Sequence, residues 1–153
     1  MQPGVIATPC FNDDPLEVLG WTAGAMRNLP LTKNMSRELE PSWFYRKKDS
    51  AIVMIFIDSK ALLKNWYLWS FDNGTTWTTP QIVDTPDSRV KQSAGNLPNG
   101  TACMVNNPSG NKNRLTLAIT VINDGFIMYK SYLLRTWEES DLHLMRLQYS
   151  TTG

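Results

Sequence analysis

The sequence predicts an all-β fold made of short strands joined by tight turns. Runs rich in β-branched and aromatic residues recur along the chain, at residues 42–46, 51–57, 66–71, 101–105, 115–122 and 126–134. Turn-forming residues separate these runs, and the Asn-Gly and Asp-Gly pairs among them supply the positive φ angles that hairpin turns need. Short strands with turns every ~8–12 residues are typical of a β-sandwich, a barrel or a propeller.

One run is apolar at every position. Residues 51–57 read Ala-Ile-Val-Met-Ile-Phe-Ile. An antiparallel strand with one wet face alternates apolar and polar residues, so we expect this strand to be buried on both faces. A strand of a propeller blade packed between two neighbouring blades meets that condition, and so does a central strand covered by helices. Helical periodicity is scarce, and only residues 137–146 could form a short helix. The all-β interpretation is therefore favoured.

The same order of parts occurs twice, starting at Glu40 and again at Lys91. The repeat is roughly 50 residues long, which is a typical length for a propeller blade. We expect blade-like units at about residues 40–85 and 91–135, with partial blades at both ends. Residues 1–153 would then form a single segment of about two to three four-stranded blades.

Composition excludes several classes of function. The net charge is +1, from 15 basic and 14 acidic residues, which argues against a nucleic-acid partner because such a partner requires a basic excess. No run of ~18 apolar residues occurs, so we expect no membrane span. The first residues lack the basic start and apolar stretch of a secretory signal, which leaves the location unknown, with secreted and cytoplasmic both open.

Cysteine and histidine are rare. The two cysteines, Cys10 and Cys103, make neither a disulfide framework nor a zinc site, and we expect Cys103 to be buried in a strand. The single histidine, His143, weakens a Ser-His-Asp interpretation. We expect neither a metal nor a cofactor.

A turn motif stands out at residues 70–77, Ser-Phe-Asp-Asn-Gly-Thr-Thr-Trp. It resembles the Asp-box, or BNR repeat, of sialidases and related propellers at every fixed position. An Asp carboxylate can accept hydrogen bonds from the turn, Gly permits a left-handed backbone, and the Trp ring can lock the hairpin. In the family the box lies on the outer turn of a blade. The resemblance therefore implies a structural role for Ser70, Asp72, Gly74, Thr76 and Trp77.

Further segments resemble a bacterial-type sialidase in their order along the chain. They are residues 40–44, 56–58, 94–100, 107–108 and 114–117, and the resemblance covers roughly residues 20–135. It implies a six-bladed propeller with a central carbohydrate site, of which this chain supplies middle and later blades. It also implies a glycoside hydrolase that removes terminal sialic acid or a related acidic sugar, with a sialoside-like glycan as its partner.

The resemblance nominates three residues for chemistry. Glu40 resembles the family's base, Arg114 resembles one of the three arginines that clamp the substrate carboxylate, and Tyr149, within a Gln-Tyr dipeptide, resembles the nucleophile. A phenol needs a neighbouring carboxylate to attack near neutral pH, and arginine gives a bidentate match to a carboxylate. The alternatives are a surface glutamate, a charge at a strand edge and a C-terminal tyrosine without a catalytic role.

Some positions depart from the family pattern, and two others have two possible roles. Ile57 stands where a second clamp arginine is expected, and the acid/base aspartate and the first clamp arginine have no match. Gln92 and Asn96 flank a strand expected to face the propeller axis, where their amides would bind sugar hydroxyls or instead cap the backbone. A non-catalytic carbohydrate-binding propeller and a structural fragment without a sugar site therefore stay open as alternative functions.

Closure of the propeller sets a further expectation. A propeller closes when its last blade packs on its first, and three blades or fewer leave apolar blade faces exposed. We therefore expect the chain to need missing blades or to self-associate.

Overall fold

The described part of the chain consists of strands and loops. A computed structural model describes residues 9–12, 16, 18–26, 39–57, 64–86, 91–107, 116–123 and 127–136, and no helix in these ranges is long and apolar enough to cross a membrane. The strands are β1 (Cys10–Phe11), β2 (Thr22–Ala23), β3 (Leu39–Tyr45), β4 (Ile52–Ile57), β5 (Lys64–Ser70), β6 (Gln81–Pro86), β7 (Ser93–Asn96), β8 (Ala102–Asn106), β9 (Thr116–Asn123) and β10 (Ile127–Thr136).

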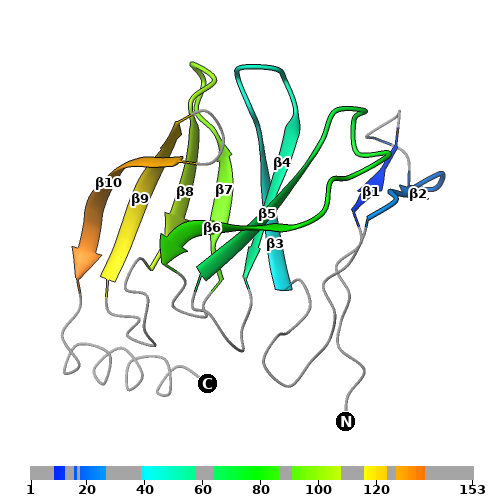
Figure 1. The fold of residues 1–153 in the computed structure, drawn as a ribbon. Coiled ribbons are helices and arrows are strands. Elements are labelled where there is room, and N and C mark those ends of the chain that lie inside the picture. The colour runs from blue at the N-terminus through cyan, green and yellow to red at the C-terminus, as the bar shows by residue number, and fades with distance from the viewer. Residues whose placement is uncertain are drawn as a thin grey trace, which may run out of the picture.

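Eight of these strands form two antiparallel four-stranded sheets, each in chain order. One sheet has the order β3-β4-β5-β6 and the other β7-β8-β9-β10, and Figure 1 shows them side by side with β1 and β2 on the far side of the first sheet. Each sheet is an up-and-down meander, as in a propeller blade. The chain is therefore an all-β, partial propeller, with β3 and β7 as the first strands of successive blades.

Hydrogen bonds connect these two first strands. The Ser42 hydroxyl accepts a bond of 2.6 Å from the Ala94 N–H, and the Asn96 side chain accepts a bond of 2.7 Å from the Tyr45 N–H. Asn96 also donates to the Tyr45 carbonyl at 2.7 Å. Because Ser42 lies beside Ala94 and Tyr45 beside Asn96, β3 and β7 run in the same direction. The start of each strand therefore lies at the same end of the blades.

The main core fills the space between the two blades. Its buried members alternate along their strands, so that each blade contributes one face: Phe44, Val53 and Ile55 from the first, and Ala102, Met104 and Ile122 from the second. The other face of the first blade carries a second cluster, of Met54, Phe56, Trp66 and Leu68, against which Met26 and Trp77 pack.

The expectation for β4 is confirmed. Val53 to Ile57 are all buried, because odd positions face the second blade and even positions face the Met26 side. Each of the six predicted runs overlaps a strand. The composition of β6 did not predict that strand. Cys103 lies in β8 as expected but is half-buried. The short helix expected at residues 137–146 lies outside the described residues.

A charged pair closes the turn between β3 and β4. Arg46 is buried and donates two hydrogen bonds to Asp49, at 2.7 and 2.6 Å. Its guanidinium carbon lies 5.7 and 5.6 Å from the ring centroids of Trp69 and Phe71. The bonds from Arg46 lower the pKa of Asp49. This arrangement holds the turn against β5 through the planar guanidinium, which can stack and donate at once.

The N-terminal segment, residues 18–26, docks on the turn that follows β5. Ala25 donates to the Thr75 carbonyl at 2.8 Å and accepts from the Trp77 N–H at 3.1 Å, which makes a parallel bridge between Ala25 and Thr76. The neighbouring Gly24 is buried, and a Cβ atom there would lie 2.2 Å from the Gly74 carbonyl oxygen. Only glycine therefore permits this close approach of two backbones.

We predict that Gly24→Ala destabilises the fold by about 1–3 kcal/mol, because the added methyl group must displace backbone rather than a flexible side chain. Urea unfolding measures the change as a lower transition midpoint. Gly95→Ala is the matched control, since a Cβ atom at Gly95 meets nothing within 4 Å and its backbone has no positive φ. Equal midpoints for the two variants would contradict the proposed docking.

Candidate functional site

The turn at residues 70–77 is held together by its own side chains. The Ser70 hydroxyl donates to Asp72 Oδ1 at 2.8 Å and accepts from the Gly74 N–H at 2.8 Å. Asp72 Oδ1 also accepts from the Thr76 N–H at 2.8 Å, and Asp72 Oδ2 accepts from the Thr76 hydroxyl at 2.5 Å. Trp77 Nε1 donates to the Gly74 carbonyl at 2.9 Å. Every fixed position of the motif therefore contributes to closing the turn.

These bonds also set the electrostatics of Asp72. The Thr76 hydroxyl and N–H, followed by the Ser70 hydroxyl, lower the pKa of Asp72 from 3.8 to about 2. A carboxylate that accepts several hydrogen bonds is stabilised in its charged form. Asp72 is thus an ionised anchor of the turn at neutral pH, and its oxygens are engaged within the turn itself.

A second group of predicted residues lies where β3 begins. Glu40 is exposed and has a φ of 49°, and the pairing of β3 with β4 shifts register between Leu39 and Ser42. A left-handed backbone at a residue other than glycine is strained and is enriched at functional sites. Ile57 pairs with Leu39 and is buried. An apolar side chain therefore lies beside the strand start that carries Glu40.

Two buried amides lie at the same end of the blades. Gln92 directly precedes β7, and Asn106 ends β8 and accepts from the Thr120 hydroxyl at 3.4 Å. Gln92 Nε2 and Asn106 Nδ2 are buried, and neither has a hydrogen-bond partner among the described residues. Because β3 and β7 run in the same direction, the structure brings Gln92 to the end where Glu40 lies.

Asn96 lies at the opposite end of β7, and its amide is engaged. In addition to its two bonds with Tyr45, Asn96 donates to the Gly100 carbonyl at 3.1 Å. This geometry corresponds to the backbone-capping alternative. Arg114 and Tyr149 lie outside the described residues, so the structure does not place them against Glu40.

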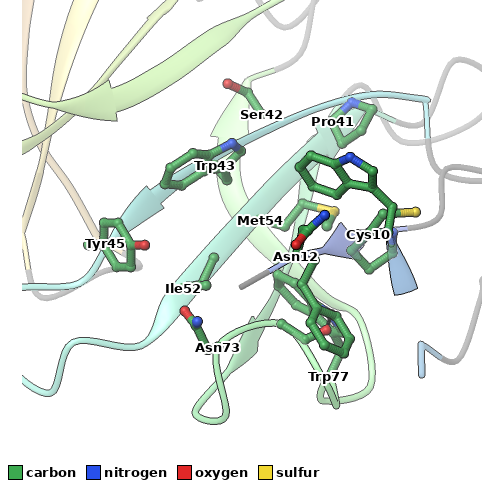
Figure 2. A pocket seen from close by; sticks show the side chains of 14 residues that line it. Cys10, Asn12, Pro41, Ser42, Trp43, Tyr45, Ile52, Met54, Asn73 and Trp77 are labelled. Atoms are coloured by element: carbon green, nitrogen blue, oxygen red, sulfur yellow. Dashed lines mark hydrogen bonds between the residues drawn. The ribbon is translucent and has the colours of Figure 1, made fainter. Parts of the chain in front are cut away.

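A pocket of about 510 Å³ lies on the other face of the first blade. Residues of β1, of β3 and β4, and of the Asp-box turn line it, and Figure 2 shows Trp43 and Tyr45 on one side with Cys10 and Asn12 across from them. Sequence reasoning missed this pocket. Trp21 and Trp43 line it and are 53% and 55% exposed.

No candidate metal centre accompanies these groups. Within the described ranges, no three His, Cys, Asp or Glu side chains gather closely enough to hold a metal ion.

Comparison with known proteins gives a family and a fold. The model of the BNR repeat-like domain matches residues 3–150. No curated protein sequence matches the chain. Among solved structures, a variant of the NanB sialidase from Streptococcus pneumoniae is similar at 18% identity with a TM-score of 0.60, and the match covers 84% of this chain and 20% of that one.

A second structure of NanB sialidase, in complex with 2-[(3-chlorobenzyl)ammonio]ethanesulfonate, matches with the same identity and coverage and a TM-score of 0.57. A third, of NanB with Optactamide, gives the same values. The chain spans about one fifth of the length of these proteins. At this identity the likeness shows the fold, which is that of a sialidase-type propeller.

We predict that Asp72→Asn destabilises the protein at neutral pH and that this difference shrinks in acid. The folded pKa is depressed to about 2, so the stabilisation by Asp72 is fully present above the unfolded pKa of about 4 and is lost as the pH falls towards 2. Urea unfolding of both proteins at about pH 6 and about pH 2.5 measures the two differences. A difference of equal size at both pH values would contradict an ionised anchor.

Proposed function

Because the chain belongs to the BNR repeat-like domain family and folds as part of a sialidase-type propeller, we propose that it is part of a sialidase-like glycoside hydrolase. The substrate class is a glycan that ends in sialic acid or a related acidic sugar. The rest of the propeller, as missing blades or as further copies of the chain, completes the central site.

Glu40 carries this proposal. It is exposed at the second residue of β3, on a strained backbone where the pairing of β3 with β4 shifts register. Glu40 opens the segment of residues 40–44, where it resembles the family's base. A carboxylate there would accept the proton of a tyrosine nucleophile. A phenol is a suitable nucleophile for an acidic sugar because it does not bring a second anion against the carboxylate.

Tyr149 and Arg114 complete the proposed chemistry, and their roles rest on the family resemblance alone. Tyr149 would attack the anomeric carbon as its proton passes to Glu40, while the glycosidic bond breaks and the leaving oxygen takes a proton from an acid on the blades that complete the site. Arg114 would bind the sugar carboxylate through two parallel hydrogen bonds. Gln92 would donate a hydrogen bond to the sugar from the end of the blade where Glu40 lies. Asn96 would bind the sugar only by giving up its hydrogen bonds to Tyr45 and Gly100.

A second candidate function is a carbohydrate-binding propeller without catalysis. The observation that favours it is Ile57, which is buried beside the start of β3 where the resemblance expects a clamp arginine. Loss of that arginine removes a charge-assisted, bidentate contact to the substrate carboxylate. A structural fragment without a sugar site is the remaining alternative.

Titration calorimetry with an unsaturated, transition-state-like sialic acid analogue tests the proposal, after light scattering has fixed the mass of the sample. We predict saturable binding that Arg114→Ala weakens by roughly 10- to 100-fold, since a hydrogen bond to a charged group contributes about 1.5–3 kcal/mol. Arg135→Ala is the matched control because Arg135 belongs to β10, the last strand of the second blade.

Turnover of a fluorogenic sialoside then separates catalysis from binding. Glu40→Gln should lower kcat by about 10²- to 10⁴-fold while the analogue still binds, because the amide keeps the shape of the side chain but cannot accept the proton. Binding without turnover by the unaltered chain would favour the carbohydrate-binding alternative. A folded chain that binds nothing would contradict the roles proposed for both Glu40 and Arg114.

A further inference from the structure

The chain contains two Asn-Gly pairs, Asn73-Gly74 and Asn99-Gly100, and both lie in turns between strands. In such a pair the glycine nitrogen can attack the side-chain carbonyl carbon of asparagine, because glycine has no side chain to hinder the approach. The bond from that carbon to the amide nitrogen breaks, the proton of the glycine N–H leaves with it as ammonia, and a succinimide ring remains. Water opens the ring to an aspartate or to an isoaspartate, whose main chain gains a carbon atom.

In the Asp-box turn a hydrogen bond holds the attacking nitrogen away from this reaction. The Gly74 N–H donates to the Ser70 hydroxyl at 2.8 Å, and Gly74 is buried. The Ser70 side chain is also buried, and its hydroxyl is oriented by the bond that it donates to Asp72 Oδ1 at 2.8 Å. Because the nitrogen must lose its proton and turn towards the Asn73 side chain, ring closure requires this buried hydrogen bond to break.

The backbone of Asn73 adds a second constraint. Asn73 has a φ of 58° and Gly74 a φ of 94°, so two successive residues have a left-handed backbone. Ring closure needs the Asn73 Cβ and the Gly74 nitrogen to eclipse one another across the Cα–C bond, and they do not do so in the left-handed region. Rotation about that bond would swing the Gly74 peptide, whose carbonyl accepts from Trp77 Nε1 at 2.9 Å.

The Asn99-Gly100 pair is held by other groups. The Gly100 N–H donates to the Leu97 carbonyl at 2.8 Å, and Asn99 Oδ1 accepts from the Thr101 N–H at 3.0 Å. None of these partners belongs to the Asp-box turn. A change at Ser70 should therefore act on the Asn73 pair alone and leave the second pair as a reference within the same molecule.

We propose that Asn73 is a deamidation site whose rate the Asp-box turn controls, with the Ser70 hydroxyl as the group that holds the site closed. The reaction needs only water besides the chain itself. Its opening follows the integrity of the turn, so that a chain whose Asp-box has loosened is the one that is modified. The proposal does not depend on glycan chemistry, and it stands or falls separately from the proposed function.

Modification would release the contact between the turn and the N-terminal segment. An isoaspartate lengthens the main chain between Asp72 and Gly74 and so displaces the Gly74 carbonyl. There is no room for that shift on the side of Gly24, where a Cβ atom would lie 2.2 Å from the Gly74 carbonyl oxygen. The modified chain therefore loses the docking of residues 18–26.

Peptide mapping by mass spectrometry tests the proposal on the full chain, incubated folded and in urea at mildly alkaline pH. We expect Asn73 to deamidate about tenfold or more slowly in the folded chain than in urea. Ser70→Ala should raise the rate at Asn73 by about tenfold, the factor that corresponds to the loss of one hydrogen bond, and leave the rate at Asn99 unchanged.

A milder pair of variants covers the case in which Ser70→Ala unfolds and both rates reach their values in urea. Thr76 is exposed, and its hydroxyl donates to Asp72 Oδ2 at 2.5 Å. Thr76→Val removes this bond and should speed deamidation at Asn73 only. Thr76→Ser keeps the hydroxyl and is the matched control, with the rate of the unaltered chain.

The isolated product measures the structural consequence. Ion exchange separates it, because conversion of Asn73 lowers the formal net charge from +1 to 0. The isoaspartate form should unfold at a lower urea concentration than Asn73→Asp, which carries the same charge on a main chain of ordinary length.

Different results would overturn the proposal. Equal rates at Asn73 in the folded chain and in urea would show that the turn gives no protection. An Asn73 rate that neither Ser70→Ala nor Thr76→Val changes, or a rise of equal size at Asn99 in folded Thr76→Val, would remove the role of the Asp-box. An isoaspartate form as stable as Asn73→Asp would show that the modification leaves the docking of residues 18–26 intact.

Discussion

The N-terminal half of the structure depends on the hydrogen bonds that the Asp72 carboxylate accepts within its turn. Its bonds to Thr76 and Ser70 set the path of the turn and thereby the position of the Gly74 carbonyl. That carbonyl accepts from the Trp77 indole and lies against Gly24. The docked segment in turn borders the pocket. The Asp72 carboxylate, which takes no part in the proposed chemistry, therefore determines where one side of the pocket lies.

Short sequence patterns predicted much of the fold because the contacts that stabilise these elements lie within the same few residues. The Asp-box could be assigned from residues 70–77 since its partners are within the motif, and β4 could be assigned as buried because all its residues are apolar. β6 was not recognised, since its sequence Gln-Ile-Val-Asp-Thr-Pro gives only a short alternation. Its place depends on pairing with β5 more than on its own residues.

The features that sequence reasoning missed arise from contacts between distant segments. The positive φ of Glu40 accompanies the shifted pairing of β3 with β4, and the engagement of Asn96 depends on β3 lying beside β7. The pocket forms only when the N-terminal segment reaches the Asp-box turn. Trp43 and Trp21 therefore had no local signal to distinguish them from tryptophans that pack within the blades, such as Trp66.

The bridge between Ala25 and Thr76 also constrains the order in which the chain can fold. The Asp-box turn closes within eight neighbouring residues, whereas docking of the N-terminal segment joins positions about fifty residues apart and must overcome a larger loop-closure entropy. During synthesis residues 24 and 25 emerge before the Asp-box turn, so their docking surface is complete only when Trp77 has followed them. Until then residues 24 and 25 cannot make their backbone bonds to the turn, so this segment stays accessible to chaperones and proteases for that interval.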